Sequence, residues 1–153
     1  KKDFFPPKNA RLMWKHDSVQ IGFDTIKNAT LGLNGGYQDD DYEYIFGLCD
    51  GASTVYRHTA AALLYDGVAR SSRAVLNDVP FAVKQHGDDV VYEIAFPSSA
   101  LSPFRLNAGN SVRWSVLVNL NDGEERVGWL ELTPGIGQHP KNPAHFIDLI
   151  LMK

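Results

Sequence analysis

The first group of side chains that could bind a ligand lies in the stretch between Trp14 and Asp24. Its apolar and polar residues alternate, which predicts a strand whose successive side chains point to opposite faces. One face, expected to be core, would carry Val19, Ile21 and Phe23. The other would carry polar groups such as Gln20, with the large ring of Trp14 at its edge. This polar face is therefore the first candidate for a ligand site.

A second candidate is the acidic run Asp39-Asp40-Asp41, which Asp24 could join. Calcium prefers six to eight oxygen ligands from carboxylates and loop carbonyls, so these residues are candidate metal ligands. The sequence lacks the spacing of an EF-hand loop, and a solvated acidic turn would explain the same run. Both interpretations stay open, with calcium as the candidate cofactor.

Residue types that could perform catalysis show no productive spacing. Glu43, Glu93 and Glu131 fall on separate predicted strands, and no second motif ties any two of them together. The five histidines lack an HExxH pattern or other ligand spacing. The single cysteine, Cys49, ends an apolar run and is expected to be a buried, inert thiol. We therefore do not expect the isolated domain to be an enzyme.

Size and charge narrow the classes of partner. A chain of 153 residues can bury one core but not two ordinary ones. The net charge of -3, without a run of Lys and Arg interleaved with aromatic residues, argues against nucleic acid as a partner. The longest apolar runs are far shorter than the roughly 20 residues that a membrane span requires.

The elements that must position these residues are short alternating runs separated by Gly, Asn, Asp and Pro. This pattern predicts an all-β fold, a two-sheet antiparallel β-sandwich. Residues 1–13, which contain Pro6-Pro7, are expected to form an extended lead-in or linker, and residues 14–153 a single sandwich domain. Trp114 and Trp129 alternate with other residues in predicted strands and are expected in the core or half-buried over it. Strands are expected at 14–24, 42–49, 54–59, 79–83, 90–96, 112–121, 127–132 and 146–151, the last one buried on both faces.

Five motifs, in order along the chain, resemble family 9 carbohydrate-binding modules, which are sandwich domains attached to bacterial glycan-degrading enzymes. They are Trp14–Ile21, Tyr37–Tyr44, Tyr92–Pro97, Val118-Asn119 with Arg126-Val127-Gly128, and Lys141–Phe146 followed by Asp148-Leu149. The resemblance implies a jelly-roll-like sandwich that binds an oligo- or polysaccharide and targets an attached or partner enzyme to it. It also implies a bacterial extracellular or periplasmic location and a neighbouring domain in a larger polypeptide.

The resemblance also assigns sugar-binding residues. Modules of this family hold a sugar ring between two tryptophans, because the apolar face of a pyranose stacks on an aromatic ring. Trp14 matches the first tryptophan, and His139-Pro140 stands where the second is expected. Gln20 replaces an acid of the family's binding strand, and Ile45 replaces a basic residue. The carbohydrate-binding set implied for this chain is Trp14, Gln20, Asn119, His139 and Lys141.

Departures from the family pattern leave alternatives. Family members have further strands before the tryptophan motif, so this domain could lack N-terminal strands and leave a sheet edge or core face uncovered. The main alternative function is a structural or docking sandwich that keeps the fold and has lost the sugar site. A remoter alternative is a haem-binding sandwich with Met13 and His139 as axial ligands.

Overall fold

The computed structural model describes residues 5–32, 35–62 and 66–153. Their elements are nearly all strands, which confirms the all-β fold predicted from the alternating sequence. In chain order the elements are η1 (Ala10–Lys15), β1 (Ser18–Asp24), β2 (Asp41–Cys49), β3 (Ala52–Thr59), β4 (Ala74–Leu76), β5 (Phe81–His86), β6 (Asp89–Ile94), η2 (Ser98–Leu101), β7 (Ser111–Asn121), β8 (Arg126–Glu131), η3 (Pro143–His145) and β9 (Ile147–Ile150).

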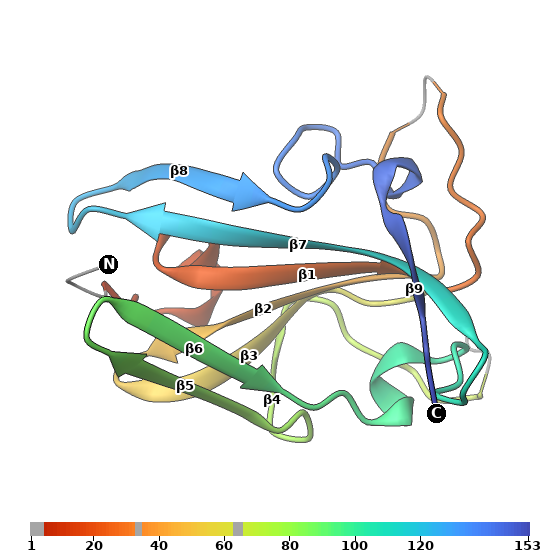
Figure 1. The fold of residues 1–153 in the computed structure, drawn as a ribbon, viewed down its shortest axis with the longest axis horizontal. Coiled ribbons are helices and arrows are strands. Elements are labelled where there is room, and N and C mark those ends of the chain that lie inside the picture. Colours follow the sequence, from red (N-terminus) through yellow and green to blue (C-terminus); the bar gives the residue numbers. More distant parts are fainter. Residues whose placement is uncertain (1–4, 33–34, 63–65) are drawn as a thin grey trace.

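The larger layer is a seven-stranded sheet in the order β4-β3-β2-β1-β7-β8, with β9 also paired to β7 (Figure 1). All its pairings are antiparallel. Strand β1 lies at its centre because it pairs with β2 on one side and with the eleven-residue β7 on the other. The first strand of the chain is therefore held between one that follows it closely and one about 100 residues later.

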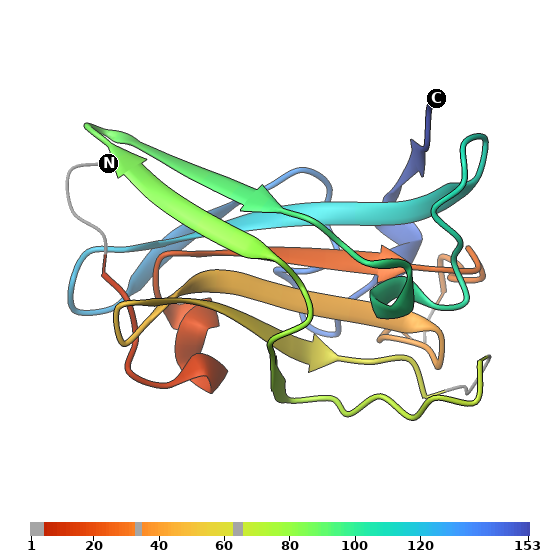
Figure 2. The same cartoon turned by 90° about the horizontal axis from the view of Figure 1, so that it is seen from below.

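The second layer is the hairpin β5-β6, which crosses one face of the large sheet (Figure 2). Aromatic rings fill the space between the two layers. The rings of Phe23, Tyr44 and Phe46 each meet Phe96 edge-on, with centroids 5.1 to 5.6 Å apart. Edge-to-face pairs of this kind add to the stabilisation that burial alone provides. Val19, Ile21 and Phe23 all belong to this core, as the alternation of the first strand predicts.

The opposite face of the large sheet is covered by η1 and by loops rather than by a second sheet (Figure 2). Met13 of η1 is fully buried against Ile45 and Tyr56. Further along the sheet, the ring of Phe146 packs so closely over Gly22 that a Cβ there would lie 2.7 Å from it. Met13 and Phe146 cover separate parts of this face and leave a polar region between them.

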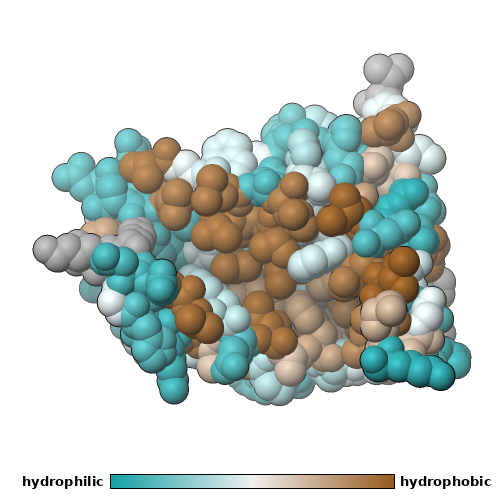
Figure 3. Space-filling view, viewed as in Figure 1, coloured by the Kyte–Doolittle hydropathy of each residue, from teal (hydrophilic) through white to brown (hydrophobic). Residues whose placement is uncertain are grey.

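Part of the core-side face remains uncovered, because the described residues place only two strands in the second layer. Apolar side chains gather over the middle of this side of the molecule, in the region of β6, β7 and β9 (Figure 3). Leu130 pairs with Val118, which packs against the core, and is still 68% exposed; Ile147 pairs with Trp114 and is also exposed. The uncovered core face is thus a property of the described structure.

Three expectations need correction. Trp14 lies in a 3₁₀ helix rather than in the first strand, because Asn9 caps that helix by accepting a hydrogen bond from the Arg11 amide. The predicted lead-in 1–13 is not a free linker over its described part, since the Pro7 carbonyl accepts from the Asp50 amide and Met13 is buried. Strand β9 is largely exposed rather than buried on both faces, because no second-layer strand covers it.

No helix among the described residues is both long and apolar enough to cross a membrane.

Candidate functional site

The polar face predicted for the first strand exists, and neighbouring strands extend it. Antiparallel pairing places directly opposed residues on the same face, so Gln20 shares its face with Ile45 and Leu117, and Ser18 shares it with Asn119. The Gln20 amide donates to Asn119 Oδ1 at 3.3 Å, and the Asn119 amide donates to Ser18 Oγ at 3.0 Å. This buried network fixes the orientation of Gln20.

A hollow of about 340 Å³ opens above Gln20. Four of the five residues assigned by the family resemblance line it: Trp14, Gln20, His139 and Lys141. The ring of Trp14 comes from η1, whereas His139 comes from the loop after β8, 125 positions later in the chain. The fifth residue, Asn119, is not among the lining residues and holds Gln20 from beneath. His58, Arg126, Ile136, Gly137 and Gln138 complete the lining.

An ion pair forms part of the wall of this hollow. Lys141 Nζ donates to Glu43 Oε2 at 2.6 Å, and the Glu43 side chain is completely buried. The same ammonium lies 5.7 Å from the centre of the Tyr37 ring. Burial, and secondly the charge of Glu43, hold the pKa of the Tyr37 phenol well above its usual value. Lys141 is therefore a partner of a buried carboxylate as well as a lining residue.

Two tryptophans flank one guanidinium at the rim. The Arg126 head group lies 4.3 Å from the centre of the Trp129 ring and 5.8 Å from that of Trp14. Trp129 is 46% exposed, so of the two expected positions it occupies the half-buried one and does not belong to the core. It pairs with Asn119 across β7 and β8, so it faces the side of the hollow. Gly137, which lines the hollow, packs against it so closely that an added Cβ would lie 2.3 Å from Trp129 Nε1.

The site thus includes residues that sequence reasoning missed. His58 lies on the same face of β3 as Tyr56, the face that η1 covers. Arg126 and Trp129 both belong to β8. The signal for Trp129 was available only through its pairing with Asn119. The β7-β8 pairing also contains a register shift at Leu120/Asn121, which a period-2 pattern does not reveal.

A second hollow of about 470 Å³ adjoins the first. Trp14 and His58 line both of them, so the indole stands between two depressions. The remaining lining residues of the second hollow are Asn9, Arg11, Leu12, Tyr56 and Arg73. Together the two hollows are large enough for more than one sugar ring.

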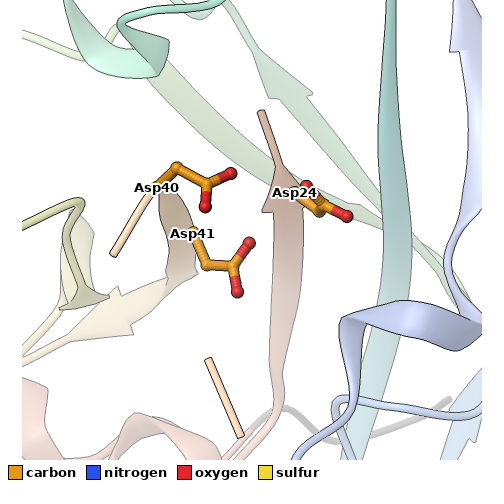
Figure 4. A group of neighbouring side chains, drawn as sticks. All are labelled: Asp24, Asp40 and Asp41. Carbon is orange, nitrogen blue, oxygen red and sulfur yellow. The ribbon is translucent and has the colours of Figure 1, made fainter. Parts of the chain in front are cut away.

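A cluster of carboxylates lies elsewhere on the sheet, at the far end of β1. Asp24, Asp40 and Asp41 are all buried, and one oxygen from each lies within 4.8 Å of the others (Figure 4). Asp24 and Asp41 meet because they are directly paired across β1 and β2. The exposed Asp39 is not part of the cluster, so Asp24 takes the place predicted for it.

The cluster has the chemistry of a cation site. Amides donate to Asp24, Asp40 and Asp41, but Asp41 Oδ1 is buried without a hydrogen-bond partner among the described residues. The guanidinium of Arg113, 3.5 Å from Asp24 Oδ2, forms an ion pair with the cluster. Burial, partly offset by the Gln38 amide, raises the pKa of Asp41 to about 8. A buried set of like charges is costly unless a counter-charge joins it, and a hard divalent cation fits oxygen donors of this kind.

The haem alternative does not fit this arrangement. Met13 is fully buried with Ile45 and Tyr56 beneath η1, whereas His139 lines the open hollow. Met13 is not among the lining residues of that hollow.

Comparison with known proteins identifies the fold. No protein-family model matches the chain, and no curated protein matches it. The solved structures that match include two of a family 9 carbohydrate-binding module from Caldicellulosiruptor kristjanssonii. The structure in complex with glucose has a TM-score of 0.62 and 20% sequence identity, over 97% of this chain and 66% of that chain. The structure in complex with cellotriose has a TM-score of 0.65 and 19% identity, over 99% of this chain and 65% of that chain.

The fold is therefore that of family 9 carbohydrate-binding modules, as the sequence motifs indicate. The chain spans just under two thirds of the length of the modules it matches.

Proposed function

We propose that this chain is a non-catalytic carbohydrate-binding domain and that the hollow beside Trp14 is its sugar site. The observation that carries the proposal is the convergence of Trp14 and Gln20 on one hollow with His139, which lies far from both in the sequence. The indole, 37% exposed, offers a flat surface for the apolar face of a pyranose, and the polar side chains offer partners for its hydroxyls. The matched modules were solved with glucose and cellotriose, which supports a saccharide ligand.

The affinity should be modest. Sugar hydroxyls exchange hydrogen bonds to water for hydrogen bonds to protein, so each contributes only about 0.5–1.5 kcal/mol. A domain of this kind gains its effect by holding an attached or partner glycan-degrading enzyme at a polysaccharide. In this proposal the protein works outside the cytoplasm of a bacterium, in the extracellular space or periplasm, where such polymers are met.

Glycan-array binding followed by calorimetry tests the proposal. The intact chain should bind at least one class of oligosaccharide, and Trp14→Ala should abolish that binding while the circular dichroism spectrum stays unchanged. Val75→Ala is the matched control, because Val75 is an exposed apolar residue of β4 that does not line either hollow. Absence of binding to every glycan, or full binding by Trp14→Ala, would overturn the assignment.

A second candidate function is supported by the uncovered core face. A sandwich that serves as a structural partner would dock this apolar surface (Figure 3) on a neighbouring domain of the same polypeptide. Such a sandwich would bind no glycan. Its apolar face would become protected from hydrogen exchange in the longer polypeptide, whereas a pure sugar-binding domain would show no such protection.

We also propose that Asp24, Asp40 and Asp41 bind calcium. The three buried carboxylates and the unmatched Asp41 oxygen support this. A cation there would tie the loop before β2 to the end of β1, since Asp40 also accepts from the Ile26 amide and from Asn28. Its role would be structural, because none of these carboxylates lines the hollow beside Trp14.

A further inference from the structure

The two hollows beside Trp14 are basic. Apart from two histidines, their ionisable lining residues are Arg11, Arg73, Arg126 and Lys141. Tyr56 also lines the second hollow, and no Asp or Glu is found among the described lining residues of either one. The whole chain carries more acidic than basic residues, with a net charge of -3. Positive charge is therefore concentrated where the ligand is proposed to lie.

The two cations of the first hollow differ in how they are neutralised. Lys141 is paired with the buried carboxylate of Glu43 at 2.6 Å. Arg126 has its Nε and one terminal nitrogen, Nη2, buried without an acceptor among the described residues. The charge of Glu131 acts on Arg126, but its carboxylate does not accept from Nε or Nη2; its Oε1 accepts from the amides of Ile136 and Gly137 at 2.5 and 3.1 Å. Arg126 is thus a cation with unmet donors.

The geometry of those donors points to one kind of acceptor. The Nε–H and Nη2–H groups lie on one edge of the guanidinium plane, and two parallel donors of this kind match the two oxygens of a carboxylate. A neutral hydroxyl can accept from only one of them in good geometry. Both nitrogens are covered in the structure, so the head group must turn from the Trp129 ring into the hollow to reach a ligand.

We infer that the ligand is an acidic saccharide, a chain containing uronic acid residues whose carboxylate pairs with Arg126. The inference rests on the proposed sugar-binding function and specifies its substrate class. Trp14 would stack a sugar ring at the border of the two hollows, while Arg11 and Arg73 would attract a further carboxylate in the second one. A nucleic acid would meet the same cations, but the described lining of the two hollows contains only four Lys and Arg side chains in total. So few cations would neutralise few backbone phosphates.

Calorimetric titration with two matched trisaccharides tests the inference. β-1,4-linked triglucuronic acid and cellotriose share linkage and ring configuration and differ in the carboxylates. The intact chain should bind the acidic trisaccharide about tenfold more tightly at low salt, and added salt should reduce this preference. Arg126→Gln should lower the affinity for the acidic trisaccharide about tenfold more than the affinity for cellotriose and so remove the preference, whereas Arg126→Lys should retain part of it. Arg105→Gln, at an exposed loop position outside both hollows, is the matched control and should retain all of it.

The outcomes separate the two proposals. Cellotriose binding as tight as or tighter than that of the acid would overturn the inference and leave the sugar-binding proposal standing. Loss of preference in the Arg105→Gln control as well would also overturn it, because the effect would then be one of net charge. Absence of binding to a panel of acidic polymers (glucuronan, polygalacturonate, alginate) and neutral ones (cellulose, xylan) would overturn both. Preferential binding of single-stranded oligonucleotide would replace the acidic saccharide with nucleic acid.

Discussion

Replacement of Lys141 by Met should destabilise the fold, not merely weaken ligand binding. Lys141 Nζ lies 2.6 Å from Glu43 Oε2, and the Glu43 side chain is 0% exposed while that of Lys141 is 25% exposed. The other carboxylate oxygen of Glu43 has no hydrogen-bond partner among the described residues. Lys141→Met would therefore leave a buried carboxylate without its ion-pair partner.

The magnitude follows from the asymmetry of buried ion pairs. Removal of one partner of a buried pair costs about 3–5 kcal/mol, because the remaining charge stays desolvated. Lys141 is a quarter exposed, so water could reach part of the vacated space, and we expect a loss of about 2–3 kcal/mol. Glu43→Gln should cost less, because the released ammonium can hydrate. The double variant should recover most of the loss, giving a coupling energy of about 1–2 kcal/mol.

The assay is urea-induced unfolding of the four members of the cycle, followed by far-UV circular dichroism at one pH and one calcium concentration. Lys84→Met is the matched control, since Lys84 is exposed on β5 and should change the unfolding free energy by less than about 0.5 kcal/mol. Our reasoning would be refuted by a Lys141→Met protein as stable as the control, or by effects of the two single changes that simply add. Lys141 would then act mainly as a surface contact for ligand.

Three further predictions concern stability and metal. Met13→Ala should cost about 2–5 kcal/mol of unfolding free energy because Met13 is fully buried, whereas Trp14→Ala on the same helix should cost about 1 kcal/mol; similar losses in denaturant melts would place the indole in the core. Calcium should raise the melting temperature, and at a hundredfold excess over Kd it should stabilise the fold by about 2.7 kcal/mol. Asp41→Asn should abolish this rise and Asp39→Asn should retain it. Scanning calorimetry in calcium and in EDTA measures the rise, and the opposite pattern would contradict the prediction. Burial lowers the pKa of His58, so its contribution to stability is lost as pH falls below about 6.5; His58→Gln should flatten this acid-side slope in urea melts, and an unchanged slope would count against it.

Local patterns predicted those parts of the fold that depend on neighbouring residues. The alternation around Gln20 correctly placed Val19, Ile21 and Phe23 in the core and left Gln20 on the opposite face, since side-chain direction in a strand has a period of two. The sandwich architecture followed from many such runs. The sequence pattern predicts Trp14 in the strand because a short 3₁₀ turn leaves no periodic signal, and only the Asn9 cap marks this turn.

The site residues that the sequence did not predict are positioned by pairing between strands far apart in the chain. Trp129 faces the hollow because β8 pairs with β7 in a register that sets it opposite Asn119, and this register is not encoded in the residues next to Trp129. Asp24, already a candidate from the sequence, meets Asp41 because β1 and β2 pair antiparallel, whereas the absence of Asp39 from this cluster of described residues is not evident from the sequence. Arg126 is recognisable as a site residue only from its position in space, between the rings of Trp14 and Trp129 and in the lining of the hollow.

The hollow beside Trp14 is assembled from distant parts of the polypeptide. Trp14 and Gln20 come from its first part and His58 from β3, while Arg126, His139 and Lys141 come from its last part. The first and last parts are brought together by the pairing of β1 with β7. Neither half of the chain alone carries the complete lining. If the proposed ligand binds there, it should oppose the separation of β1 from β7, because a ligand that binds only the native state stabilises the whole fold.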